Sequence, residues 1–588
     1  MKNLRQFVDV LSAEGELLAI DVPLSPHLVI PEIQRRTVAL GGPALLFRNV
    51  HGSPFQVATN LFGSHKRMEL AFGRKPEQLI KDLVSIVDHL PPKISELWHK
   101  RRSAFQLLKT GLKHKSSGPV LDCSLDDLSL IPALTCWPED GGPFITLPLV
   151  YTEDPQTRKG NLGMYRIQIQ GPKQTGMHIQ IHRGGGNHYA KAEAMSKPLD
   201  AAVFVGGPPA LIIAAVAPLP EDVPELVFAS LLQGQKLSMI ERVVDRPLPL
   251  VAEADFCIWG QIPPHRREDE GPFGDHYGYY SLCHPYPVLE VKHITHRKDA
   301  IYPATVVGRP PQEDHFMAVY LQDLFKPLFP LVMKGVRDVF AFEESGVHSV
   351  AGALVNERYG RESFTAALRI LGEGQLSLTK VLLATDQEVD VRNFGQLLQT
   401  ILARCTFETD LFVFSNISLD TLDYTGPEVN KGSKALLLGT GAPKYQLQKD
   451  VPNAIGDGRF GSASLYVPGC LVVRGPAYHP GDGIPEMLLQ MPEIKDFRWV
   501  CLHDDPKAAT ASDAAFLWHI FTRFEPAADI YGNPRVVRNH LSFSAPLVID
   551  CRMKPSYPDI LVPDEETVDT VNRIWSSLGI DEWLERRA

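Results

Sequence analysis

The chain has 588 residues, a length that predicts about three or four domains and not one hydrophobic core. Hydrophobic residues make up 44% and charged residues 22%, and the formal charge of −10 argues against a nucleic-acid partner, because phosphate binding needs a basic surface. The longest apolar stretch, residues 210–218, is too short for a transmembrane segment, and residues 1–11 lack the uninterrupted apolar core of a secretory signal. We therefore expect a soluble, cytoplasmic protein.

The first 120 residues predict an N-terminal α/β domain, 1–120. An amphipathic helix is predicted at its start by the spacing of four apolar residues, Leu4, Phe7, Val8 and Leu11. Short β-rich runs follow at residues 44–47 and 55–58, and a basic, helix-like stretch occupies residues 95–115. The eight cysteines form no Cys-x-x-Cys pair, which excludes zinc ribbons and is typical of reduced thiols in a cytoplasmic protein.

Residues 121–325 have a different predicted secondary structure, which consists of short strands divided by Gly/Pro turns. Four runs in which polar and apolar residues alternate predict half-buried strands: 144–146, 166–169, 178–181 and 289–294. A helix with proline in its first turn is predicted at residues 224–232. The density of short strands predicts a barrel-like β domain for this part of the chain.

Residues 326–470 predict a C-terminal α/β domain, because buried strands alternate with helices. The strands are expected at 349–351, 380–384 and 411–414, and the helices at 363–371 and 391–404. Residues 471–588 give a weaker signal and are interpreted as an extension. No internal repeat is visible in the sequence.

The extension ends in a predicted amphipathic helix whose apolar stripe consists of Val568, Val571, Ile574, Trp575 and Leu578. Such a stripe must be buried against another surface. We interpret that surface as a second subunit, which predicts a homo-oligomer, most simply a two-fold dimer.

Two carboxylates, Glu270 and Asp275, are separated by glycine, proline, phenylalanine and glycine, a composition that does not form an ordinary helix turn. A loop of this kind can aim both carboxyl groups into one pocket and hold them in different protonation states, as proton transfer requires. An acidic turn before a strand is the alternative interpretation of this loop.

Upstream, residues 161–168 read Asn-Leu-Gly-Met-Tyr-Arg-Ile-Gln and residues 177–186 read Met-His-Ile-Gln-Ile-His-Arg-Gly-Gly-Gly. Together with the acidic loop, these motifs resemble the UbiD family of decarboxylases, which use prenylated FMN. Further matching pieces occur at residues 60–64, 219–225 and 308–314, and the resemblance covers residues 1–470. It implies a mixed α/β fold in which a central split β-barrel of flavin-reductase type is flanked by N-terminal and C-terminal α/β domains.

The resemblance implies that Asn161 and Glu225 bind Mn²⁺ against the cofactor phosphate, with K⁺ as an additional ion. An amide oxygen and a carboxylate suit a hard cation. The third ligand is left open between His178, which we favour, His182 and no histidine at all. Without the resemblance, Glu225 would be interpreted as a first-turn carboxylate that interacts with the helix dipole, and Asn161 as a turn residue.

Three successive glycines can form a concave nest for a phosphate, although a flexible turn has the same composition. The resemblance assigns this region, with the adjoining strands, to prenylated FMN. The implied cofactor-binding residues are Asn161, Met164, Tyr165, Arg166, His178, Ile179, Gln180, Arg183, Gly184, Glu225 and Lys380. Without the resemblance, Lys380 would be interpreted as a solvent-facing strand end.

Arg166 lies in a β-run, and burying its guanidinium is costly without a carboxylate partner, for which Glu270 is the candidate. The resemblance implies a catalytic set of Arg166, Glu270 and Asp275. Arg166 would orient the substrate carboxylate and keep Glu270 ionised, and Asp275 would deliver the proton that replaces CO₂. For that role we expect apolar neighbours and Glu270 to raise the pKa of Asp275.

The resulting hypothesis is a reversible carboxy-lyase acting on an aromatic or α,β-unsaturated acid, such as a 4-hydroxy-3-polyprenylbenzoate or a naphthoate in ubiquinone or menaquinone biosynthesis. It would depend on a prenyl-flavin synthase of UbiX type, because loss of CO₂ from an sp² carbon needs a cofactor as electron sink. The alternatives are an FMN-binding split-barrel oxidoreductase, a hydrolase using the two carboxylates, and a non-enzymatic scaffold. Retention of the arginine and both acids argues against the oxidoreductase, a hydrolase would leave the metal and phosphate features unused, and a scaffold has no use for converging acids and an arginine.

Overall fold

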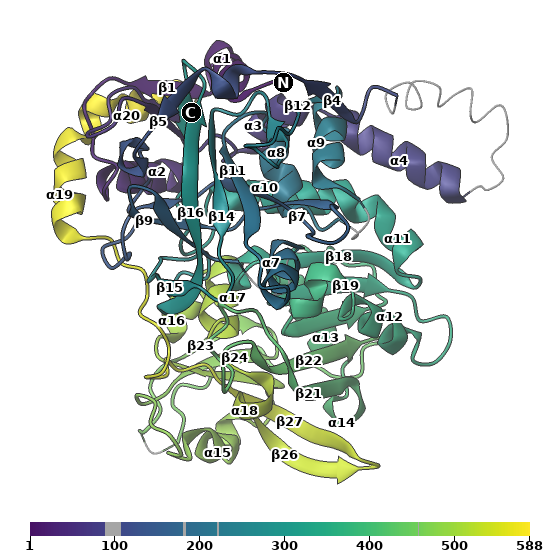
Figure 1. The fold of residues 1–588 in the computed structure, drawn as a ribbon. Helices are drawn as coiled ribbons and strands as arrows, with labels where there is room; N and C mark the ends of the chain where they lie inside the picture. Colours follow the sequence, from purple (N-terminus) through teal and green to yellow (C-terminus); the bar gives the residue numbers. More distant parts are fainter. Residues whose placement is uncertain (89–107, 180–183, 220–222, 457, 588) are drawn as a thin grey trace. The chain divides into compact units, whose positions relative to one another are not determined.

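The computed structural model describes residues 1–588 except 89–107, 180–183, 220–222, 457 and 588 (Figure 1). The chain divides into two compact units. Unit 1 comprises Met1–Gly308, Gln312–Leu324 and Ile560–Ala588, and unit 2 comprises Arg309–Pro311 and Phe325–Asp559. Among the helices of the described ranges, none is both long and apolar enough to cross a membrane.

Unit 1 begins with a four-stranded sheet in the order β1-β2-β3-β17. Its strands are β1 (Leu17–Ile20), β2 (Ala44–Phe47), β3 (Gln56–Thr59) and β17 (Ile301–Pro303), and the helices beside it in the sequence are α1 (Leu4–Ala13), α2 (Val29–Ala39), α3 (His65–Phe72) and α4 (Lys75–Asp88). The predicted N-terminal helix is confirmed, since all four of its apolar residues are buried. The predicted basic stretch falls largely outside the described residues, and its end forms strand β4 (Leu112–Lys115), not a helix.

The centre of unit 1 is a ten-stranded sheet in the order β6-β9-β10-β16-β14-β11-β7-β8, with β15 and β5 paired to the long strand β16 (Figure 1). The strands are β5 (Cys123–Leu125), β6 (Phe144–Ile145), β7 (Pro148–Glu153), β8 (Gly160–Gly163), β9 (Ile167–Gly171), β10 (Gln174–Met177), β11 (Leu199–Val205), β14 (Phe256–Ile262), β15 (Arg267–Glu270) and β16 (His284–His296). In the described part of the chain no pairing joins β6 to β8, so the sheet is not a closed barrel.

Three of the four strands predicted in this region are confirmed as β6, β9 and β16. The fourth, 178–181, is wrong at its start, because β10 ends at Met177. The predicted helix 224–232 is α9 (Glu225–Gln233), for which Pro224 is the N-cap residue.

Unit 2 contains a first five-stranded sheet in the order β18-β19-β20-β22-β21. Its elements are β18 (Val336–Phe342), η4 (Glu343–Ser345), β19 (Val350–Val355), α12 (Glu362–Ile370), β20 (Val381–Thr385), α13 (Phe394–Leu402), α14 (Phe407–Asp410), β21 (Leu411–Ser418) and β22 (Lys431–Gly439). The strands and helices predicted between 349 and 414 are confirmed within a few residues.

A second five-stranded sheet in unit 2 has the order β23-β24-β25-β27-β26. Its elements are β23 (Ala463–Val467), β24 (Cys470–Arg474), α15 (Ile484–Leu489), β25 (Trp499–His503), α17 (Asp513–Phe521), α18 (Pro526–Asp529), β26 (Ile530–Val537) and β27 (His540–Asp550). The strand order and directions match those of the first sheet. Residues 463–550 therefore form a regular α/β layer of the same order, although no repeat is visible in the sequence.

The terminal helix α19 (Glu565–Ile574) returns to unit 1 and packs on α2 of the same chain, as Figure 1 shows with α19 in yellow and α2 in purple. Val571 and Leu578 are buried in the core of unit 1, and Ile574 and Trp575 pack against it. The apolar stripe is thus covered within one chain and supplies no argument for a second copy of the protein.

Candidate active site

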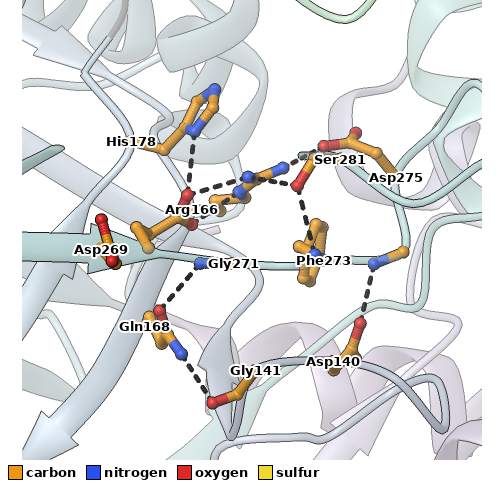
Figure 2. A network of polar contacts seen from close by, with 12 residues as sticks. Asp140, Gly141, Arg166, Gln168, His178, Asp269, Gly271, Phe273, Asp275 and Ser281 are labelled. Atoms are coloured by element: carbon orange, nitrogen blue, oxygen red, sulfur yellow. Dashed lines mark hydrogen bonds and ion pairs between the residues drawn. The ribbon is translucent and has the colours of Figure 1, made fainter. Parts of the chain in front are cut away.

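Arg166 is the centre of a polar network in unit 1 (Figure 2). It lies between β8 and β9, and its guanidinium holds Glu270 with two parallel bonds, Nε to Oε1 at 2.8 Å and Nη2 to Oε2 at 2.9 Å. Its remaining nitrogen, Nη1, donates to Oδ2 of Asp275. The structure therefore brings together the arginine and both carboxylates that the sequence singled out.

Glu270 ends strand β15, and its side chain is fully buried. Burial acts to raise the pKa of Glu270, but the Arg166 guanidinium and a contact with His178 outweigh it and lower the pKa to about 2. In return, Glu270 overcomes the burial of Arg166 and raises the pKa of that guanidinium. At neutral pH this pair is an ion pair.

Asp275 is buried at the other end of the acidic loop, and its Oδ1 accepts from His276 N at 2.8 Å and contacts His276 Nδ1 at 2.6 Å. Burial acts to raise the pKa of Asp275, but His276 and Arg166 outweigh it and hold the pKa below its ordinary value. The expectation of a raised pKa is wrong for this state of the protein. His276 and the Arg166 guanidinium, both at hydrogen-bond distance, have a stronger effect than the apolar surroundings and Glu270.

Asp140, which was not predicted from the sequence, binds the acidic loop to a preceding turn (Figure 2). Its Oδ1 accepts from Gly274 N at 2.7 Å, and its Oδ2 accepts from the amides of Cys136 and Trp137 at 2.8 and 2.9 Å. A side chain cannot replace Gly274, because an added Cβ would lie 2.0 Å from the Trp137 ring. Burial raises the pKa of Asp140 to about 6.

Gln168 and Ser281 were also not predicted, and they hold the network in shape. The Gln168 amide accepts from Gly271 N at 3.0 Å and donates to Gly141 O at 2.8 Å. Ser281 Oγ accepts from Arg166 Nη2 at 2.9 Å. Gln168 lies two residues from Arg166 along one strand run, so the period of two could have revealed it, whereas nothing in the sequence marks Ser281.

His178 belongs to the same network, since its Nδ1 lies 3.2 Å from Glu270 Oε2 and its ring packs 4.3 Å from that of Tyr286. These contacts direct it toward the Arg166–Glu270 pair, so its place as a third metal ligand stays a prediction. Ile179 is buried beside it. Gln180, His182 and Arg183 lie outside the described residues.

Asn161 and Glu225 meet at a second corner of unit 1. Glu225 is the first residue of α9, its Oε2 accepts from Leu162 N at 3.1 Å, and burial raises the pKa of this carboxyl group. One terminal atom of the Asn161 amide lies 3.3 Å from Glu225 Oε1. If this atom is Nδ2, Asn161 donates a hydrogen bond to Glu225. If it is Oδ1, the Asn161 and Glu225 oxygens face each other, as two ligands of one cation do.

The glycine run is the start of helix α7 (Gly184–Ala194), not a loop. Gly184 lies so close to Asn161 that an added Cβ would be 2.0 Å from Asn161 Oδ1. Gly185 N donates to the Tyr165 hydroxyl at 3.2 Å, and Met164 is half-buried beside Tyr165. A helix N-terminus next to oxygen donors fits a phosphate and a divalent cation.

Lys380 lies in unit 2, directly before β20. Its side chain is fully buried, and Nζ lies 2.7 Å from Asp423 Oδ2 and 3.3 Å from Thr425 Oγ1. The interpretation of this lysine as a solvent-facing strand end is therefore wrong. Its role in cofactor binding stays a prediction.

Comparisons with known proteins identify the family. Models of the UbiD family, described as 3-octaprenyl-4-hydroxybenzoate carboxy-lyase, match residues 8–87 with the N-terminal domain, 113–310 with the Rift-related domain and 315–439 with the C-terminal domain. A protein of Chlamydia trachomatis serovar D is 45% identical over 584 residues, which cover 98% of this chain and 100% of the relative. A protein of Chlamydia pneumoniae, named as one of the subunits of a 4-hydroxybenzoate decarboxylase, is 44% identical over 98% of both chains.

Two solved structures share the fold. Vanillic acid decarboxylase of Sedimentibacter hydroxybenzoicus in its closed form has a TM-score of 0.66 at 23% identity and covers 77% of this chain and 96% of its own. The UbiD-class enzyme HmfF of Pelotomaculum thermopropionicum in complex with FMN has a TM-score of 0.61 at 24% identity and covers 75% and 94%. At such low identity these likenesses show the fold alone.

Proposed function

This chain belongs to the UbiD family of carboxy-lyases, and we propose that it removes CO₂ from an aromatic carboxylic acid with the help of prenylated FMN. The observation that carries the proposal is the convergence of Arg166, Glu270 and Asp275. The substrate class that we propose is a 4-hydroxybenzoate. The quinone precursors in question are a 4-hydroxy-3-polyprenylbenzoate or, alternatively, a naphthoate. The name of the Chlamydia pneumoniae relative supports the hydroxybenzoate class.

The bound cofactor would supply the electron sink that no side chain of this network offers. Asn161 and Glu225 would hold Mn²⁺, with K⁺ as an additional ion, and the N-terminus of α7 would face the phosphate. The fit rests on the half-buried carboxyl of Glu225, the adjacent amide of Asn161 and the glycine that leaves room beside it. A synthase of UbiX type would supply the prenylated cofactor.

Arg166 would orient the carboxylate of the substrate. Glu270 occupies two of its nitrogens, which leaves Nη1, the nitrogen that now contacts Asp275, as the position for an incoming carboxylate. Because Glu270 stays ionised down to a pH of about 2, Arg166 keeps its partner throughout the pH range of the cell. A bidentate pair of this kind holds the guanidinium plane in one orientation.

Asp275 would protonate the carbon that loses CO₂. A substrate carboxylate at Nη1 displaces Asp275 from its cation and adds a like charge, and both changes raise the pKa of Asp275. Its Oδ1 could then accept the proton from His276 Nδ1, 2.6 Å away, and pass it to the carbon as the new C–H bond forms. CO₂ leaves as a neutral molecule, and the proton that Asp275 delivers neutralises the electron pair that remains at the carbon.

The test is to co-express the chain with a prenyl-flavin synthase and to measure CO₂ release from hydroxybenzoates, naphthoates and cinnamates. The matched control is Glu270→Gln, which keeps the shape of the side chain and removes its charge. Wild type should release CO₂ from the hydroxybenzoate class, while the variant carries the same flavin absorbance without turnover. Cofactor-loaded wild type that decarboxylates no aromatic acid would refute the proposal, and nicotinamide oxidation instead would favour the FMN oxidoreductase.

We also keep three structural proposals that the sequence raised. Residues 121–325 form a split β-barrel domain, with domains at 1–120 and 326–470 on either side of it and an extension at 471–588. The protein assembles as a homo-oligomer. Sedimentation at micromolar concentration measures the mass directly, and a monomer would remove the last proposal.

A further inference from the structure

The two five-stranded sheets of unit 2 repeat one architecture. We name residues 336–439 the first repeat and residues 463–550 the second repeat. In each sheet, the two outer strands run antiparallel to their neighbours and the three inner strands are parallel. In the sequence of each repeat, one helix follows the second strand and another lies between the third and fourth strands. A match of order, direction and connection over five strands points to one fold used twice.

Equivalent backbone bonds in the two repeats set the register of this match. The amides of residues 380–381 both donate to Ser349 O, at 2.8 and 2.9 Å. The amides of residues 498–499 both donate to Gly469 O, at 3.1 and 3.0 Å. The third strand in sequence, β20 or β25, starts with the same pairing in each repeat, so the positions of the second repeat can be assigned to those of the first.

A side-chain bond is repeated as well. Asp410 Oδ2 accepts from Thr406 N at 2.9 Å, and Asp529 Oδ2 accepts from Glu525 N at 2.7 Å. Each aspartate lies four residues after its donor and directly before the fourth strand of its repeat. This shared turn is a local feature that the common strand order does not require.

The repeats bury equivalent faces in one common core. Residues at matched positions lie in that core in three pairs, Leu383 and Cys501, Leu398 and Leu517, Ile401 and Ile520. The opposite face of each sheet has a core of its own, with Leu436 in that of the first repeat and Val548 in that of the second. The same face of both repeats is therefore turned toward the other repeat.

The packing between the repeats is reciprocal. Helix α14 of the first repeat packs on β27 of the second, and α18, its counterpart, packs on β22, the counterpart of β27. Likewise α13 packs on β23, while α17 packs on η4, which directly follows β18, the counterpart of β23. The starts of these two helices meet, since Gly395 N donates to Asp513 Oδ2 at 3.3 Å. Such exchange of equivalent elements defines an isologous, two-fold interface.

We propose that the second repeat is the built-in partner of a self-complementary face on the first repeat, so that unit 2 is a two-fold dimer within one chain. The kind of partner that fits this face is a copy of the first repeat. The family models end at residue 439, before the second repeat begins. Relatives from Archaeoglobus fulgidus and Aquifex aeolicus match 75% of this chain over 92% of their own length, so they lack a counterpart for a quarter of it.

The first test separates the second repeat from the rest of the folded chain. Protease sites are inserted between Asp450 and Val451 and between Pro555 and Ser556, which are exposed positions on either side of the second repeat. After cleavage of the folded protein, native mass spectrometry at micromolar concentration should show the fragment 451–555 bound 1:1 to the rest of the cleaved chain. Dissociation of the fragment would overturn the proposal.

The second test uses matched substitutions in the cleaved protein. Ile401→Ala and Ile520→Ala remove the same group at equivalent, fully buried positions of the common core, and each should speed release of the fragment by about 10-fold or more. The control is Leu436→Ala, fully buried in the separate core of the first repeat, which should leave the release rate unchanged. Equal release from control and core variants, or an effect of only one isoleucine, would contradict the two-fold relation.

Discussion

Asp140 offers a substitution that should separate stability from activity. Asp140→Asn keeps the size of the side chain but leaves one acceptor oxygen where the carboxylate has two. If that oxygen stays on Gly274 N, the new amide group faces the N–H groups of Cys136 and Trp137. The variant therefore loosens the turn that places Asp275, one residue after Gly274.

The effect on stability follows from the pKa of Asp140, which burial raises from 3.8 to about 6. A carboxyl group whose pKa is higher in the folded protein contributes stability below pH 3.8, and this contribution is lost as the pH rises through about 6. About two units at about 1.4 kcal/mol each give a cost of about 3 kcal/mol for the ionised group at pH 8. A neutral asparagine avoids this cost, which exceeds the loss of the bonds from Cys136 N and Trp137 N at about 1 kcal/mol each, so the variant should be at least as stable as wild type at pH 8.

The effect on turnover has the opposite sign. A shift of a catalytic group by about 1 Å can cost about 100-fold in rate, so we expect turnover to fall about 10-fold to 100-fold with flavin content unchanged. Urea midpoints and CO₂ release, measured at pH 8 on cofactor-loaded protein, give both quantities. Glu139→Gln, at an exposed neighbour, is the matched control. A parallel loss of stability and turnover in Asp140→Asn would refute this reasoning, because it would make the residue a purely structural one.

Three further predictions concern single contacts. Glu225→Ala should yield folded protein with little bound flavin and metal, and full flavin occupancy measured by absorbance would contradict the metal assignment. Asp275→Asn should bind the cofactor normally and lose turnover by about 100-fold or more, with hydrogen–deuterium exchange at the product carbon falling in parallel. Ser281→Ala removes one acceptor from Arg166 Nη2 and should raise KM for the acid more than it lowers kcat. An unchanged KM would show that Glu270 alone orients the guanidinium.

Features that depend on local periodicity were predictable from the sequence. The spacing of Leu4, Phe7, Val8 and Leu11 predicts α1, and all four side chains are buried where the helix packs. The acidic loop was found for the same local reason, because proline and glycine restrict the backbone at known positions. The pairing of Arg166 with Glu270 followed from the cost of an unpaired buried charge.

Features that depend on which distant surface covers a segment were not predictable. The stripe of α19 has the same spacing whether it packs on a second copy of the protein or on α2, and only the fold shows that α2 covers it. The repeat was hidden because matched core positions keep their apolar character but change their residues, as Leu383 and Cys501 do. Hydrophobic periodicity indicates burial, and burial alone does not identify the neighbour.

The sign of the Asp275 pKa shows how contact geometry decides between opposing effects. The sequence places Glu270 and apolar residues near Asp275, and both raise a carboxyl pKa, but it does not show that Arg166 reaches both acids at once. Because the same guanidinium and His276 hold Asp275 ionised, the resting site carries no acid proton at this position. A substrate carboxylate that takes the place of Asp275 on Arg166 would make that proton available only when the acid to be decarboxylated is bound. The arginine would then couple substrate binding to the protonation of the group that completes the reaction.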